Sequence, residues 1–212
     1  MVVAREGPDG VEVLVLERSG NSRFAPGFVV FPGGALEPGD EDLAVRWFGS
    51  PEHAARACAV RELYEEAGML VTAGGVVTAS AGQPRIEELA FAPPDPEALP
   101  EMSRWIAPEF IPRRFDARFF AVAAPSGVEP TPDGVEIERA WWARAGQVMA
   151  RAAAGEVPLM WPTLKTLESL RECATVQEVL ALRVPQVEPP LGRLGPVRPP
   201  DGGPVAWREP GP

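Results

Sequence analysis

The sequence is poor in the residues that build zinc sites, disulfide frameworks and histidine-based catalytic triads. Its 212 residues include one histidine, His53, and two cysteines, Cys58 and Cys173, with no CxxC pair. Two isolated cysteines argue against a structural zinc site and favour a reducing, cytoplasmic setting. A triad would need His53 as its base. No apolar run reaches the roughly 18 residues that a membrane span requires, so we expect no membrane partner.

Positive charge is also scarce. The chain has 20 basic residues, of which only Lys165 is a lysine, against 30 acidic residues, and its net charge is -10. A protein with this balance does not coat nucleic-acid phosphates, so we expect no nucleic-acid partner. It can still bind a small phosphorylated ligand if divalent cations lie between the two sets of negative charge.

Proline and glycine are abundant, because 26 prolines and 21 glycines make up more than a fifth of the chain. This excess argues against an all-helical bundle. It gathers in a stretch over 83–104, where we expect a long irregular insertion, and again from Pro185 onward. We predict one folded domain over 1–184 and a tail over 185–212 that is disordered or laid along the surface.

The hydrophobic pattern predicts strands that come before and after a long helix. Strands are expected at 11–16, 28–31, 69–72, 119–123 and 138–142, with a loop at 35–50. The long helix is expected to begin at the cap Ser50-Pro51-Glu52 and to end at Gly68. Further helices are expected at 144–154, 162–171 and 176–182. This order predicts a mixed α/β or α+β domain.

The densest chemical signal lies in the last turns of the long helix. Glu62, Glu65 and Glu66 are spaced so that their carboxylates project from one helix face. Carboxylates held together in this way suit Mg²⁺ or Mn²⁺, and Arg61 is placed to pair with Glu65 and orient it. The alternative is a solvated acidic face, which is common on exposed helices. The strand end Phe31-Pro32-Gly33-Gly34 upstream favours the metal site.

These residues resemble the Nudix hydrolase signature, G-x5-E-x7-R-E-U-x-E-E-x-G-U, where U is a bulky aliphatic residue. The second half matches fully from Arg61 to Met69, whereas the acid that follows Gly34 after five intervening residues is Asp40 and not glutamate. Twenty residues then separate Asp40 from Arg61 instead of seven, so 13 are inserted. Counted back along the helix, the family's first glutamate falls on His53, beside Glu52. The resemblance therefore implies a weakened brace between the loop and the helix.

An interrupted signature over 33–70 resembles the RP2-type branch, which includes coenzyme A diphosphatases. The stretches 56–62 and 112–120 are similar to the same branch, and the likeness spans about residues 10–182. This resemblance implies a Nudix α/β/α sandwich with a mixed sheet and extra C-terminal helices. It also implies that Gly34, Arg61 and Gly68 have structural roles.

The resemblance further implies that water attacks a nucleoside diphosphate linked to another group. One to three Mg²⁺ or Mn²⁺ ions would be held by Glu62, Glu65 and Glu66, with Glu66 the essential ligand and Glu65 and Glu66 catalytic. The general base maps first to Glu136 and second to Glu138, although both could be solvated hairpin charges. Coenzyme A or an acyl-coenzyme A is the leading substrate. ADP-ribose, a dinucleoside polyphosphate, or a binding module without catalysis are the alternatives.

Several residues outside the signature are candidates for binding the substrate. Arg113, Arg114 and Arg118 could grip its phosphates, or could only brace nearby acids. Trp105 is the aromatic residue we expect to contact a ligand, whereas Trp142 is expected to pack. Cys58 is expected to be a small buried residue and His53 a surface residue. The insertion or the tail could also support a homodimer.

Overall fold

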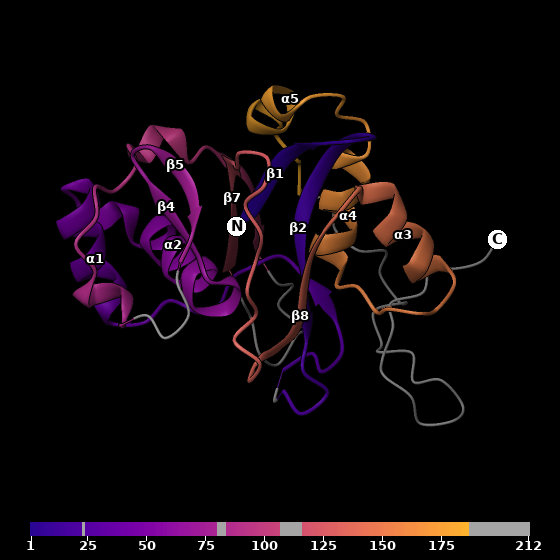
Figure 1. Ribbon diagram of the computed structural model, residues 1–212, viewed down its shortest axis with the longest axis horizontal. Helices are drawn as coiled ribbons and strands as arrows, with labels where there is room; N and C mark the ends of the chain where they lie inside the picture. The colour runs from indigo at the N-terminus through magenta and orange to yellow at the C-terminus, as the bar shows by residue number, and fades with distance from the viewer. Residues whose placement is uncertain (23, 80–83, 107–115, 187–212) are drawn as a thin grey trace.

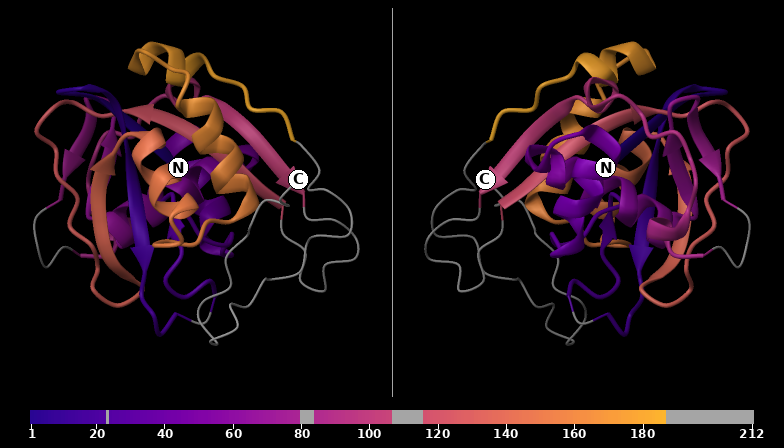
Figure 2. Two further views of the ribbon diagram at one scale, coloured as in Figure 1. Left: turned by 90° about the vertical axis from the view of Figure 1, so that its right-hand side faces the viewer. Right: turned by 90° about the vertical axis from the view of Figure 1, so that its left-hand side faces the viewer.

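A mixed β-sheet lies between two layers of helices in the computed structural model, which describes residues 1–22, 24–79, 84–106 and 116–186 (Figure 1). One face carries α1 (Gly39–Phe48), α2 (Ala54–Ala67) and the hairpin of β4 (Met69–Thr72) and β5 (Gly75–Thr78). The other face carries α3 (Ala145–Ala153) and α4 (Trp161–Leu170), while α5 (Val176–Ala181) contacts β1 and β7. Figure 2 shows the orange helices α3 and α4 in front in one view and the purple helices in front in the other. The α/β/α sandwich is confirmed.

Strand β2 (Gly10–Arg18) pairs with three others. It is antiparallel to β1 (Val2–Gly7), β3 (Val29–Val30) and β8 (Ile137–Ala143). Beyond β1 follow β7 (Asp116–Ala123), which is parallel to β1, and β6 (Glu101–Ile106), which is antiparallel to β7. The order is β3-β2-β1-β7-β6 with β8 on β2, and the β1–β7 pair makes the sheet mixed.

Both faces of β2 are buried, which explains its continuous apolar run. Leu14 and Leu16 point into the core shared with α1 and α2, whereas Val13 and Val15 point into the core shared with α3 and α4. The alternation follows from the period of two along a strand. One strand therefore supports both helical layers.

Local signals place α2. The Ser50 hydroxyl accepts a hydrogen bond from the Glu52 amide, and a short 3-10 turn over Pro51–His53 leads into the helix. At the other end Gly68 adopts the left-handed conformation with φ 61°. Both termini agree with the sequence prediction, as do the strands expected around 11–16, 69–72, 119–123 and 138–142 and the three C-terminal helices.

The loop expected at 35–50 is wrong over most of its length, because the inserted residues form α1. Leu43, Ala44 and Trp47 are buried in the same core as α2, and Gly49 ends the helix at φ 77°. The three acids of the first turn obscure this apolar face in the sequence. Such acids stabilise a helix N-terminus, so the same charges that suggested a loop favour the helix.

The irregular insertion expected at 83–104 is wrong at its end, where β6 begins at Glu101. A register shift between Glu101 and Ser103 breaks the alternation that would have revealed the strand. Strands β1 and β5 were also not predicted. The expected tail lies outside the described residues beyond Gln186. Across the described part of the chain, no helix has the length and apolarity to cross a membrane.

Candidate active site

The acidic face of α2 lies against the glycine pair that follows β3. The amide of Gly33 donates to Oε2 of Glu66 over 2.8 Å. A Cβ atom built on Gly34 would lie 2.2 Å from Oε1 of Glu62, far inside van der Waals contact. Only glycine lets the backbone approach this carboxylate so closely. The structural role predicted for Gly34 therefore has a physical basis in the position of Glu62.

Arg61 is the centre of a buried network. Its Nε and Nη2 donate to the two carboxylate oxygens of Asp40 over 2.8 and 3.0 Å. Its Nη1 donates to Glu62 over 2.8 Å and to Glu65 over 2.9 Å. Burial alone would lower the pKa of Arg61, but Asp40 and Glu62 together raise it above its ordinary value. The predicted Arg61–Glu65 pair is present, and the guanidinium orients three carboxylates.

The weakened brace inferred from the interrupted signature is wrong, because Asp40 supplies it. Asp40 is separated from Gly34 by five residues, is fully buried and binds Arg61 in a bidentate manner. The insertion follows Asp40 and folds as most of α1, so counting back from Arg61 reaches an unrelated turn. His53 lies there half-buried, with its ring edge-on to Phe48.

Glu66 is the most buried of the three helix carboxylates, at 4% exposure. Burial is the largest cause that raises its pKa, to about 8; the Gly33 amide opposes the rise and the charge of Glu62 adds to it. Burial likewise raises the pKa of Glu62, against the opposing charge of Arg61. Glu65 is exposed by comparison. The site thus concentrates negative charge where water stabilises it poorly, and a cation would stabilise it.

The side chains of this site have the donor chemistry of a Mg²⁺ or Mn²⁺ site but are not assembled as one. All three candidate ligands are carboxylates, which these hard cations prefer. Glu62 and Glu65 are both bonded to Arg61, and Glu66 faces Gly33. Within the described ranges, no three acidic, histidine or cysteine side chains are grouped as a cation site. Binding a cation would therefore require these side chains to exchange their present partners.

Arg18, at the end of β2, is a site residue that the sequence pattern did not single out. Its Nη1 lies 3.5 Å from Oε1 of Glu66, and its Nη2 donates to Oε2 of Glu136 over 3.2 Å. Glu136 is thereby linked to the α2 carboxylates, whereas Glu138 lies at an exposed position on β8. In the sequence, the one feature that could have indicated Arg18 is its position as a charged residue at the end of an apolar strand.

Of the four predicted substrate-binding residues, the structure describes Arg118 and Trp105. Arg113 and Arg114 lie outside the described residues. Arg118 pairs with Glu101 across the β6–β7 pair, over 2.8 Å. Trp105 is 3% exposed, and its indole N–H donates to Ser103, so its burial between strand neighbours supports packing and not the expected ligand contact.

Two packing predictions are confirmed. Cys58 is buried, and burial raises the pKa of its thiol to about 12. Trp142 donates its indole N–H to the carbonyl of Val128 and lies under Arg5, whose guanidinium carbon is 4.3 Å from the ring centre. Both residues therefore pack within the fold, as expected.

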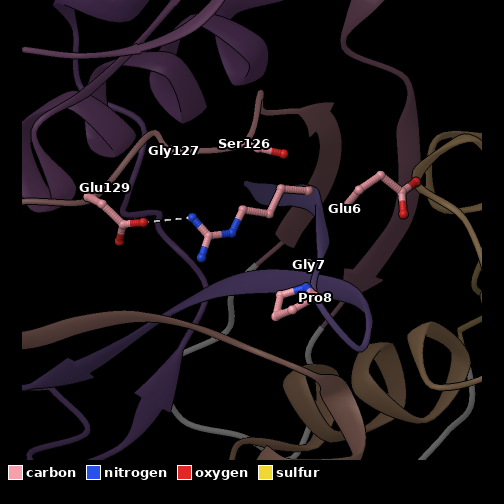
Figure 3. A pocket seen from close by; sticks show the side chains of 7 residues that line it. Glu6, Gly7, Pro8, Ser126, Gly127 and Glu129 are labelled. Carbon is pink, nitrogen blue, oxygen red and sulfur yellow. Dashed lines mark hydrogen bonds and ion pairs between the residues drawn. The ribbon is translucent and has the colours of Figure 1, made fainter.

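A separate open pocket lies where β1 turns toward β2 (Figure 3). The carboxylate of Glu129 pairs with the guanidinium of Arg5 over 2.8 Å, and Arg5 also pairs with Glu12 over 2.9 Å. The charge of this arginine is already compensated. None of the residues lining the pocket belongs to the acidic site on α2.

Comparison of the sequence with known proteins finds a matching family. The NUDIX domain profile matches residues 1–165. The chain is 30% identical over 175 residues to a Caenorhabditis elegans protein named Putative nudix hydrolase 7, covering 76% of this chain and 56% of that protein. It is 33% identical over 140 residues to Acyl-coenzyme A diphosphatase NUDT19 of Gallus gallus, covering 47% and 35%. The chain thus spans about half or less of the length of these relatives.

A solved structure supports the same grouping. The NUDIX hydrolase from Alicyclobacillus acidocaldarius superposes with a TM-score of 0.71 at 30% identity. The match covers 86% of this chain and 94% of that one.

Proposed function

The chain belongs to the Nudix family, and from this premise we propose that its α2 site hydrolyses a nucleoside diphosphate linked to another group. The observation that carries the proposal is the burial of Glu66 against Gly33, beside Glu62 and Glu65 fixed by Arg61. If these glutamates formed only a solvated acidic face of the helix, all three carboxylates would be exposed, and none would be buried as Glu66 is.

Glu62, Glu65 and Glu66 are the residues that would hold Mg²⁺ or Mn²⁺. Bound there, the cation would neutralise charge on the diphosphate and lower the pKa of a bound water. In the structure Arg61 holds two of them and the Gly33 amide holds the third, and a bound cation would take the place of these partners. Asp40 in turn holds Arg61 from the opposite side.

Glu136 is the general base in this proposal. Its carboxylate would accept a proton from the water that attacks phosphorus, and the bridging P–O bond would break to release two phosphate monoesters. The link through Arg18 to Glu66 favours Glu136 over Glu138, whose position on β8 has no corresponding link to α2 among the described contacts. The reaction requires a base near the metal ligands, and Arg18 links Glu136 to one of them, Glu66.

We propose coenzyme A or an acyl-coenzyme A as the preferred substrate. Support comes from the branch-like insertion in the signature and from the partial similarity to the chicken acyl-coenzyme A diphosphatase. Cleavage of the diphosphate in such a substrate gives adenosine 3′,5′-bisphosphate and an acyl phosphopantetheine. These two products identify the bond that is broken.

A substrate panel tests this proposal. Purified protein is incubated with Mg²⁺ or Mn²⁺ and coenzyme A, two acyl-coenzyme A esters, ADP-ribose, NADH or diadenosine tetraphosphate, and products are identified by mass spectrometry. We expect the highest kcat/KM on a coenzyme A compound. A tenfold higher kcat/KM on ADP-ribose, NADH or diadenosine tetraphosphate would overturn the assignment of coenzyme A as the substrate. Binding without turnover of any compound would show a non-catalytic module.

A further inference from the structure

Arg18 contacts three separate segments of the chain with its guanidinium group. Its Nε donates to the carbonyl of Phe24 over 3.0 Å, its Nη2 donates to Glu136, and its Nη1 pairs with Glu66 on α2. The side chain is only 12% exposed. Every nitrogen of the group is therefore engaged, and the three partners come from the β2–β3 loop, the segment before β8, and the helix.

The backbone around Glu136 is fixed independently of Arg18. The Asp133 carboxylate accepts hydrogen bonds from the amides of Val135, Glu136 and Ile137 over 2.8–3.1 Å. The carbonyl of Glu136 accepts from the amide of Ser19 over 2.8 Å. The side chain of Glu136, by contrast, is 65% exposed. Its backbone is held in place, and the direction of its carboxylate depends on the bond to Arg18.

This arrangement distinguishes Arg18 from an arginine that grips substrate. A phosphate-binding arginine directs its N–H groups at the ligand from an accessible position. Arg18 is largely buried, donates hydrogen bonds to the Phe24 carbonyl and to Glu136, and forms an ion pair with Glu66. Its two carboxylate partners are the candidate base and the candidate essential metal ligand, so the guanidinium sets the distance between them.

We propose that Arg18 is a positioning residue that holds the Glu136 carboxylate toward Glu66, at the place where the attacking water is deprotonated. The inference rests on the proposed hydrolase function and adds a residue outside the signature to its site. Arg18 acts through Glu136 and does not itself touch substrate. Loss of the guanidinium should therefore slow turnover more than it weakens substrate binding.

The test compares Arg18→Ala with wild type in steady-state kinetics on a substrate that wild type cleaves. We expect kcat to fall about 10- to 100-fold, as for partners that orient a catalytic group, with KM changed less than about threefold. Arg139→Ala is the matched control, because Arg139 lies on neighbouring β8, pairs with Glu17 and has a side chain that is 60% exposed. It should keep wild-type kcat. A rise in KM with unchanged kcat would assign Arg18 to substrate binding and overturn the inference.

A double-mutant cycle tests the route of the effect. In a Glu136→Gln background, Arg18→Ala should lower kcat by less than about threefold further, because the group it positions is already lost. A further fall in kcat as large as that of the single variant would mean that Arg18 does not act through Glu136. Added guanidinium should partly restore Arg18→Ala but not the double variant. Absence of rescue in the single variant, with its fold intact by circular dichroism, would count against the inference.

Mn²⁺ binding, measured by electron paramagnetic resonance without substrate, separates the role toward Glu136 from one toward Glu66. Arg18→Ala should bind Mn²⁺ at least as tightly as wild type, because it removes a positive charge beside the ligands. A tenfold weaker affinity would mean that Arg18 mainly holds Glu66 and would overturn the proposal. If Arg18→Ala does not fold, Arg18→Lys, which keeps the charge, serves in both measurements. Inactive wild type would instead refute the hydrolase function itself.

Discussion

Replacing Asp40 by asparagine tests whether the buried brace stabilises the signature helix. The Asp40 carboxylate is fully buried and forms two hydrogen bonds with Arg61, of 2.8 and 3.0 Å. Its Oδ2 also accepts from the amide of Glu37 over 2.8 Å. Asparagine keeps the shape and one acceptor but removes the charge and turns the second acceptor into a donor. The change therefore affects the pairing and leaves the packing nearly intact.

The structure sets the size of the expected loss. Breaking a buried ion pair by removing one partner costs about 3–5 kcal/mol when the other charge is left uncompensated. Arg61 retains Glu62 and Glu65, so its charge stays partly balanced. We therefore expect Asp40→Asn to lower the free energy of unfolding by about 2–4 kcal/mol. For a protein of this size each kcal/mol corresponds to roughly 2–4 °C in Tm.

Urea unfolding monitored by circular dichroism measures this loss, and Glu65→Gln is the internal comparison. Glu65 bonds to the same Nη1 of Arg61, but its side chain is 45% exposed, so water screens the pair. Its loss should cost less than about 1 kcal/mol. Equal and small effects for the two variants, with unchanged m values, would refute the reasoning that burial makes the Asp40 pair important.

Three further predictions follow from the same structure. Gly34→Ala should lower kcat by about 100-fold in steady-state assays, because the new Cβ forces the Glu62 carboxylate away by about 1 Å; a rate near wild type would contradict it. Gly68→Ala should lose about 1–2 kcal/mol in thermal unfolding, because φ is 61° there; an unchanged Tm would show that the backbone relaxes freely. Cys58 should react with a thiol reagent at pH 8 far more slowly than half-exposed Cys173. At a pKa of about 12, only about 1 in 10⁴ Cys58 thiols is ionised at this pH. Equal reaction rates in the two single-cysteine variants would contradict the burial of Cys58.

The parts of the fold that were predicted correctly depend on local signals. The β2 strand is visible as a continuous apolar run, and α2 carries its own start at Ser50 and its own end at Gly68. Helix α1 was missed because three acids dilute the apolar face that Leu43 and Trp47 provide. Only its packing on α2 shows that this face is buried.

The candidate site was predictable as far as it lies on one helix. Glu62, Glu65 and Glu66 follow from the spacing within α2, but the partners that tune them are distant in the sequence. Asp40 and Arg18 approach the helix only through the tertiary fold, and no periodicity in the sequence reports such contacts. The expected ligand contact of Trp105 was not supported for the same reason, because its burial depends on the irregular pairing of β6 with β7.

The most direct test of the central claim compares Glu66→Gln with Glu172→Gln. The two substitutions are chemically identical, but Glu66 is buried in the proposed metal site, while Glu172 is exposed and pairs only with Arg171 among the described contacts. The measurement is the initial rate of acyl-coenzyme A cleavage at saturating Mg²⁺. We predict that Glu66→Gln is at least about 100-fold slower, a larger loss than an orienting partner causes, and that Glu172→Gln matches wild type. Equal rates in the two variants would contradict a hydrolase site built on the carboxylates of α2.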